Sequence, residues 1–275
     1  MRIQSIASRD GLRLLWCLAL VLTFSLLSCD DDSSPSGPDV VNTDFSASED
    51  FFLRIGIADQ SRLRLEAISG SVEITGASGV DSVTIWGERR VESESVADAE
   101  EHLQQLSVEM SESGGQIAVW TEQPEQSHGR NYIVEYHAEV PTTWQLAVEQ
   151  VNGNIAISTT ENSVEANLVN GTMRLWDISG SVDGEGINGT IDGKIFLPPS
   201  ETCTLRITNG TIGLLIPQST SATFAAQVSV GTIALHNLSL QNQNVTPTSL
   251  TGTLGAGEGE IELLTVNGNI SVTGF

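Results

Sequence analysis

The sequence predicts an all-β fold, a parallel β-solenoid of short coils with one short helix near its N-terminal end. The 275 residues include 26 glycines, 5% aromatic and 17% charged residues, a composition typical of strands and turns rather than of a helical enzyme. Short runs alternate apolar and polar residues, as half-buried strands do. An Asn-Gly unit also recurs, with glycines 18 apart at Gly153, Gly171 and Gly189 and 21 apart at Gly189, Gly210 and Gly231. A fixed period of this length indicates stacked repeats.

An antiparallel β-sandwich is the alternative fold. Asn-Gly is the strongest short-range signal for a two-residue hairpin turn. Alternating strands and turns do not by themselves distinguish parallel from antiparallel pairing. The repeat favours stacking, because an antiparallel meander has no need to return the same four residues at the same phase.

Residues 1–28 are predicted to be a lipoprotein signal peptide. Arg2, Arg9 and Arg13 precede the apolar run Leu14–Ser28, which is short for a membrane span. Leu26-Leu27-Ser28-Cys29 resembles the lipobox of bacterial lipoproteins, in which the cysteine is acylated and becomes the new N-terminus. The resemblance implies lipidation of Cys29 and a protein anchored to a bacterial membrane in the cell envelope, outside the cytoplasm. The sequence does not indicate whether this is the inner or the outer membrane.

Residues 29–50 are predicted to form a flexible tether. The segment is rich in Asp, Ser and Pro and shows no apolar periodicity before Phe51. We expect it to hold the folded part of the chain away from the lipid surface.

Residues 51–145 are predicted to be an irregular β region with one short helix. Ser95 to Asp98 resembles a capping box, and apolar residues follow at helical spacing up to Leu106. We expect this helix to cover the first coils, whose strand edges would otherwise be unpaired. The strand-like runs are Leu63–Leu65, Ser71–Thr75, Ser82–Trp86, Gln116–Thr121 and Tyr132–Val140.

Residues 146–275 are predicted to form the Asn-Gly repeat solenoid. Within one unit, Ile155 and Ile157 lie two residues apart and so face the same side of a strand. The preceding Asn-Gly suits a sharp corner, because glycine adopts positive φ at little cost. Stacked coils would superimpose the apolar residues and pair each backbone with the next coil, and the corner asparagines would form a ladder of amide hydrogen bonds. The predicted corner residues are Asn152, Gly153, Asn170, Gly171, Asn188, Gly189, Asn209, Gly210, Asn267 and Gly268.

The C-terminal part of the repeat is imperfect. The 37 residues that separate Gly231 from Gly268 include an irregular glycine-rich stretch, so we expect one coil to bulge or to give way to a loop. The final coil, Val266–Phe275, ends the chain with no visible cap. We therefore expect an open edge there that invites self-association.

The sequence contains no recognisable catalytic motif, and we predict no catalytic residues, no metal site and no cofactor. The four histidines are scattered, and the zinc, thiol-redox and nucleophile-elbow motifs are missing. Cys203 lies in a strand pattern and is expected to be a small packed side chain. Trp86 and Trp176 each follow an inward-facing residue, so alternation turns them outward, where an indole stacks well on a sugar ring. The alternative is that both pack under a neighbouring loop or helix.

The charge of the chain excludes nucleic acid as a partner. The formal net charge is -23, and Lys194 is the only lysine in the sequence. Phosphate backbones require a cationic surface, which this composition does not supply.

The order of the motifs resembles a known bacterial family. ISGSVEITG, DSVTIWG, a short helix, YIVEYHAEVP, LAVEQVNGNIAI and successive NG-x-I units up to VNGNISV resemble the DUF4097 family of candidate adhesins and are similar to the related DUF2807 domains. The resemblance extends from about Phe51 to Phe275 and implies a β-helix-like stack on an exported or membrane-bound protein. No catalytic residue carries over.

We therefore expect a membrane-anchored adhesin or surface scaffold that binds a protein or glycan and is not an enzyme. The alternative is an enzyme that acts on extracellular polysaccharide. A cluster of perturbed carboxylates in a groove would favour the enzyme, whereas an even, polar surface would favour the scaffold.

Overall fold

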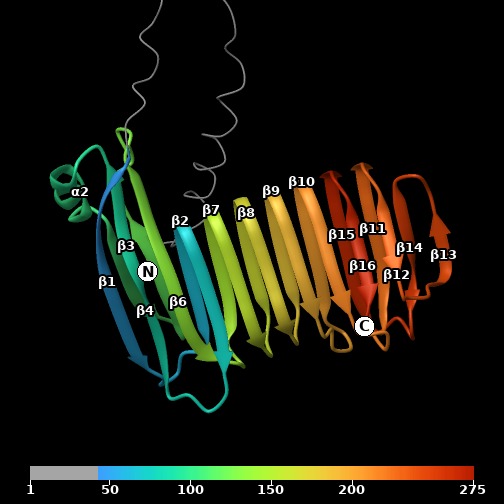
Figure 1. Cartoon of the computed structure of the whole chain (residues 1–275). Helices are drawn as coiled ribbons and strands as arrows, with labels where there is room; N and C mark the ends of the chain where they lie inside the picture. The colour runs from blue at the N-terminus through green and yellow to red at the C-terminus, as the bar shows by residue number, and fades with distance from the viewer. Residues whose placement is uncertain (1–42) are drawn as a thin grey trace, which may run out of the picture. The chain divides into compact units, whose positions relative to one another are not determined.

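A computed structural model describes residues 43–275, so that the predicted signal peptide, Cys29 and the first part of the predicted tether lie outside the described residues. The described chain contains one helix, α2 (Val96–Leu103), and sixteen strands that are hydrogen-bonded into one sheet (Figure 1). The strands are β1 (Phe45–Gly56), β2 (Arg62–Ala77), β3 (Ser82–Ser93), β4 (Ser107–Ser113), β5 (Gln116–Glu122), β6 (Asn131–Pro141), β7 (Gln145–Thr160), β8 (Val164–Ile178), β9 (Val182–Ile195), β10 (Thr202–Ile216), β11 (Ala222–Val230), β12 (Ile233–His236), β13 (Gln241–Val245), β14 (Ser249–Leu254), β15 (Gly259–Asn267) and β16 (Ile270–Gly274).

The central strands are parallel and in register. Strands β2, β7, β8, β9 and β10 lie side by side in chain order, as Figure 1 shows. Asn152 lies opposite Asn170, which in turn lies opposite Asn188. The all-β class, the short helix and the predominantly parallel pairing are therefore confirmed, and the antiparallel sandwich is not favoured. Strand β2 pairs with β7 through Gly70 and Gly153, so the two predicted β regions belong to one continuous sheet.

Each central strand has two halves that meet at the Asn-Gly corner. In β8, the buried residues are even-numbered before the corner and odd-numbered after it, from Val164 to Leu168 and from Met173 to Leu175. The switch occurs at Gly171, whose φ is +139°. Gly184, in the first half of β9, lies next to the side chains of Met173 and Leu175, in the second half of β8. The two halves therefore pack against each other across one apolar core.

Three antiparallel strands extend the sheet at its N-terminal side. Strand β1 pairs with β3, and β3 pairs with β6. The prediction of a tether up to residue 50 was therefore wrong over residues 45–50, which pair with β3. Within residues 45–50 only Ala47 is partly buried and the other residues are exposed, so this part of β1 shows little of the alternation of a half-buried strand. An ion pair from Arg89 Nη2 to Glu49 Oε2, 2.5 Å long, also holds this polar segment in the sheet.

Helix α2 forms where the capping pattern predicts it. The Ser95 hydroxyl accepts a hydrogen bond of 3.2 Å from the Asp98 amide, and Ala99 and Leu103 are buried. The helix packs against β1 and β3. It therefore covers the antiparallel extension rather than the parallel coils that we expected it to cover.

The final coil does not end the stack, so the predicted open edge was wrong. Strand β15 lies between β10 and β11, and β16 lies between β10 and β12. The corner at Asn267-Gly268 continues the pattern of Asn209-Gly210, whereas the coil at Val230-Gly231 lacks the asparagine. The last coil therefore matches the corner of β10 better than the coil of β11 does. The expected irregularity near Gly231 is real: β14 pairs antiparallel with β11, and β13 then pairs antiparallel with β14.

Candidate binding surface

The corner asparagines form a hydrogen-bonded ladder along one corner of the stack. Four of its five side-chain amide nitrogens donate to the side-chain oxygen of the preceding rung in space, at 2.8–3.0 Å. The ladder consists of Asn152, Asn170, Asn188, Asn209 and Asn267. These amides bond to one another from rung to rung, so the ladder stabilises the stack. The predicted corner glycines Gly153, Gly171, Gly189, Gly210 and Gly268 all have positive φ, between +132° and +154°.

The outer face before the corner carries carboxylates that contact arginines. Arg206 lies at 2.8 Å from Glu262, at 3.3 Å from Glu185 and at 3.8 Å from Asp183. Burial raises the pKa of Asp183, repulsion from Glu185 adds to the rise, and Arg206 opposes it. These three carboxylates are therefore held in ion pairs with one arginine.

A shallow depression lies on the same face beside these groups, with a volume of about 310 Å³. Hydroxyl-bearing side chains make up much of its wall, with Arg62, Glu165 and Asp183 also lining it. Within residues 43–275, no group of three or more His, Cys, Asp and Glu side chains is placed to hold a metal ion. The lining residues are Arg62, Gln145, Leu146, Ser163, Val164, Glu165, Ser181, Val182, Asp183, Thr202 and Thr204.

The outer face after the corner carries a row of rings, which we name the aromatic row: Phe52, Trp86 and His137, with Glu73 at its end. These residues lie opposite one another on the adjacent strands β1, β3, β6 and β2. Trp86 and His137 stack with centroids 5.6 Å apart and 17° between their planes. His137 Nδ1 lies 3.2 Å from a carboxylate oxygen of Glu73, which fixes the orientation of the imidazole. Phe52 is 66% exposed and Trp86 39% exposed, so the row is open to solvent.

Trp176 projects from the same face, as alternation predicts, but it has different neighbours. Its partners across the sheet are Ser158 and Lys194, and its side chain is half-buried. Neither of these partners is aromatic. The structure thus places the two predicted tryptophans in different surroundings, and only Trp86 lies in a row of rings.

Cys203 lies inside the core, as expected for a packed side chain. Its residue is only 1% exposed, and burial raises the pKa of the thiol to about 12. A thiol of this kind is neutral at physiological pH and so is a poor nucleophile.

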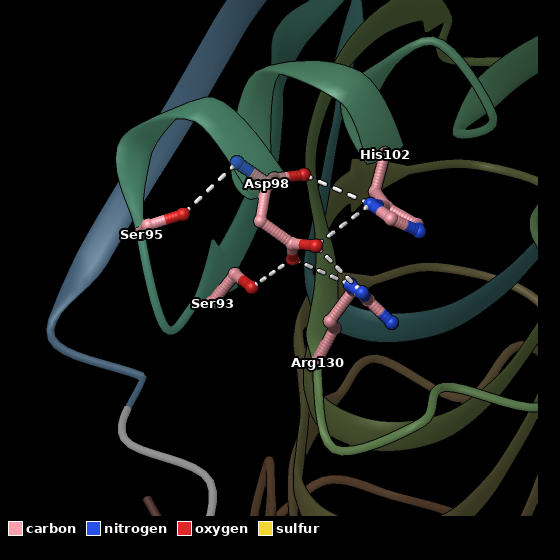
Figure 2. A network of polar contacts seen from close by, with 5 residues as sticks. All are labelled: Ser93, Ser95, Asp98, His102 and Arg130. Atoms are coloured by element: carbon pink, nitrogen blue, oxygen red, sulfur yellow. Dashed lines mark hydrogen bonds and ion pairs between the residues drawn. The ribbon is translucent and has the colours of Figure 1, made fainter.

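A polar network ties helix α2 to the start of β6 (Figure 2). Arg130 forms two hydrogen bonds with the carboxylate of Asp98, from Nε at 2.6 Å and from Nη2 at 2.7 Å. The hydroxyl of Ser93 donates to the same carboxylate, and His102 Nδ1 lies 3.5 Å from it. The hydrogen bonds from Arg130 and Ser93 hold the pKa of Asp98 well below its usual value. This network anchors the helix to the sheet.

Replacing Asp98 should lower stability in a pH-dependent way. A carboxylate whose pKa is lower in the folded than in the unfolded state contributes stability that is present above its unfolded pKa and is lost as the pH falls through its folded pKa. We therefore expect Asp98→Asn to lower the Tm by a few degrees at pH 7, and this difference should shrink as the pH falls below 4. Thermal unfolding of both proteins between pH 7 and pH 2.5 checks this. An equal difference at every pH would contradict the proposed role of the charge.

The sequence identified one of the four residues of the aromatic row. Trp86 was predicted to point outward, whereas Phe52, His137 and Glu73 were not singled out. His137 and Glu73 lie in predicted strands, and their parity turns them outward. The missing information was the antiparallel pairing of β3 with β6, which brings His137 beside Trp86.

The chain is similar to solved structures of candidate adhesion proteins from several bacteria. No family model matches the chain, and no curated protein matches it, so membership of DUF4097 stays a prediction. A solved structure of a candidate cell adhesion protein from Clostridium sporogenes is similar at 10% identity and a TM-score of 0.47, covering 83% of this chain and 100% of that one. A candidate adhesin from Bacteroides fragilis has 8% identity and a TM-score of 0.33, covering 82% and 97%. One from Parabacteroides merdae has 12% identity and a TM-score of 0.27, covering 82% and 96%.

Proposed function

We propose that this chain is an exported, lipid-anchored β-solenoid that serves as an adhesin or surface scaffold and is not an enzyme. The in-register stack from β2 to β15 is the observation that carries the proposal. Stacked repeats present extended surfaces on which the same side-chain positions recur at every rung, and such surfaces suit contact with large partners.

The charged face supports a binding role more than a catalytic one. Hydrolysis of a glycosidic bond needs two carboxylates in distinct protonation states on either side of a substrate. Here Arg206 lies among Asp183, Glu185 and Glu262 and neutralises part of their charge. The raised pKa of Asp183, next to a depression, is the one observation that favours the alternative, an enzyme acting on polysaccharide. Loss of polysaccharide cleavage on Asp183→Asn, if cleavage is found, would establish that alternative.

The proposed anchor rests on Cys29 and on the lipobox pattern before it. No helix within residues 43–275 is long and apolar enough to cross a membrane. Two or more acyl chains on Cys29 would hold the chain stably to lipid, since each buried methylene contributes about 0.8 kcal/mol.

Cys29→Ala tests the anchor and the location together. We expect the wild-type chain, expressed in a Gram-negative host, to sediment with membranes and to carry acyl chains at Cys29 by mass spectrometry. The variant should lose the acyl chains and leave the washed membrane fraction. Cys203→Ala is the matched control and should remain at the membrane. If the Cys29→Ala variant stays in the membrane fraction after residues 1–28 have been removed, or if the wild type carries no lipid, the anchoring proposal is wrong.

The adhesive role has its own measurement. Cells that display the wild-type chain should adhere to a surface coated with desialylated mucin better than cells that make Cys29→Ala. Equal adhesion, with the wild-type protein shown to be protease-accessible on intact cells, would contradict the role.

A further inference from the structure

We infer that the aromatic row binds a neutral oligosaccharide, an inference that rests on the proposed adhesive function. The row runs across four neighbouring strands, with Phe52, Trp86 and His137 followed by Glu73. Adjacent strands are about 4.8 Å apart, so the row is about 14 Å long. It therefore offers a platform for several sugar rings rather than for one.

The strands of the platform and its Trp86–His137 stack are in place before any ligand arrives. Its residues lie on paired strands, and the contact between His137 and Glu73 orients the imidazole at one end of the row. On the opposite side of the same sheet, Phe51 packs edge-on against Tyr136 with centroids 5.5 Å apart, which joins β1 to β6. A preorganised binding surface loses little conformational entropy when the ligand binds.

The rows on either side of the platform are polar. Asp50, Glu88 and Glu135 face one another on one side, and Ser71 completes that row. Arg54, Thr84, Glu139 and Thr75 form the row on the other side. Carboxylate and hydroxyl oxygens accept hydrogen bonds from sugar hydroxyls, while the exposed rings contact the apolar faces of the sugars.

The surrounding charge selects the class of ligand. The four acidic residues in the two flanking rows outnumber the single arginine, and the whole chain carries a formal net charge of -23. Anionic glycans, nucleic acids and acidic lipid surfaces would be repelled. A protein partner that docks on an apolar patch would meet these charges around only two exposed apolar side chains, Phe52 and Trp86. A neutral polyhydroxylated ligand satisfies both the rings and the acceptors.

Calorimetric titration tests the site on the full-length protein in detergent. The probes are the neutral tetrasaccharides cellotetraose, laminaritetraose, chitotetraose and mannotetraose, with the anionic tetragalacturonate as a comparison. We expect at least one neutral probe to bind and tetragalacturonate to bind more weakly or not at all. Trp86→Ala and Phe52→Ala should each weaken binding about tenfold, the loss expected for one stacking ring.

Trp176→Ala is the matched control, because Trp176 lies on the same face outside the aromatic row. It should bind as the wild type does, and Trp86→Phe should retain most of the affinity. Because both row residues are exposed, the thermal unfolding of the variants should stay close to that of the wild type, and Phe52→Ala decides the matter if Trp86→Ala is unstable. The inference is overturned if no neutral probe binds, if tetragalacturonate binds equally well, or if only Trp176→Ala reduces binding.

Failure of this site and failure of the adhesive role are distinguishable. If cells that display Trp86→Ala adhere like wild-type cells and none of the neutral probes binds, the inference is wrong while adhesion stands. If wild-type cells do not adhere at all, the proposed function itself fails, whatever the titrations show.

Discussion

Gly171→Ala should destabilise the protein by at least about 4 kcal/mol, in the extreme tail of single substitutions. A Cβ built on Gly171 would lie 1.7 Å from the carbonyl oxygen of Gly153 and 2.8 Å from its carbonyl carbon. Both atoms belong to the backbone of the adjacent rung, so no side-chain rotation relieves the clash. The positive φ of Gly171 adds strain for any residue with a Cβ. Thermal unfolding should show a Tm lower by about 10 °C or more, or the variant should be recovered only as aggregate.

Gly79→Ala separates the two causes. Gly79 also has positive φ, +72°, but a Cβ there would have no heavy atom within 4 Å. The control should therefore cost only the backbone strain, about 1–2 kcal/mol. If the two variants were equally stable, the close approach of successive corners would not be the cause of the larger loss expected for Gly171→Ala.

Leu175→Ala should cost about 4 kcal/mol, in the upper part of the range for buried leucines. Leu175 is fully buried in the second half of β8, and its partner position on β9 is Gly193. Gly184 of strand β9 also faces the core. Leu175 lies next to the position that a Cβ on Gly184 would occupy. Because β9 has no side chains at these positions, nothing there moves in to fill the cavity that the substitution leaves. Denaturant unfolding measures the loss.

Arg174→Ala is the matched control for Leu175→Ala. Arg174 is the preceding residue of β8 and is exposed on the outer face. Its replacement should change the free energy of unfolding by no more than about 0.5 kcal/mol. A similar loss in both variants would mean that the core of β8 is not the source of its stability.

The sequence was sufficient for the parallel core because each rung repeats the same local chemistry. A corner such as Asn170-Gly171 needs a glycine with positive φ and an asparagine that bonds to the equivalent asparagine of the next rung. Both requirements appear in the sequence as an Asn-Gly pair at a nearly constant spacing. The glycines of β9 were harder to interpret. Gly184 and Gly193 face the core, and larger side chains of neighbouring rungs fill the space beside them. The sequence of β9 alone does not indicate which side chains these are.

The ends of the sheet were harder to predict for a different reason. Strands β1 and β4 have few buried residues, so their sequences resemble polar linkers, and pairing with β3 and β5 alone makes them strands. Predicting the position of β15 requires deciding whether β11 or β15 pairs better with β10. That decision depends on the energies of pairing between strands that lie far apart in the sequence. For the same reason the sequence pointed to Trp86 but not to its neighbour His137, which lies some fifty residues further along the chain.

The place of β15 and β16 has a consequence for how the protein matures. A chain that emerges N-terminus first can close β7 to β10 as each rung appears. Strand β11 cannot settle against β15 at that stage, because β15, which separates it from β10, is made after β11. A chain truncated before residue 259 would leave two strand edges without partners inside the sheet. The slot between β10 and β11 thus stays open until β15 and β16 have been made, so the sheet closes by joining segments that lie far apart in the sequence.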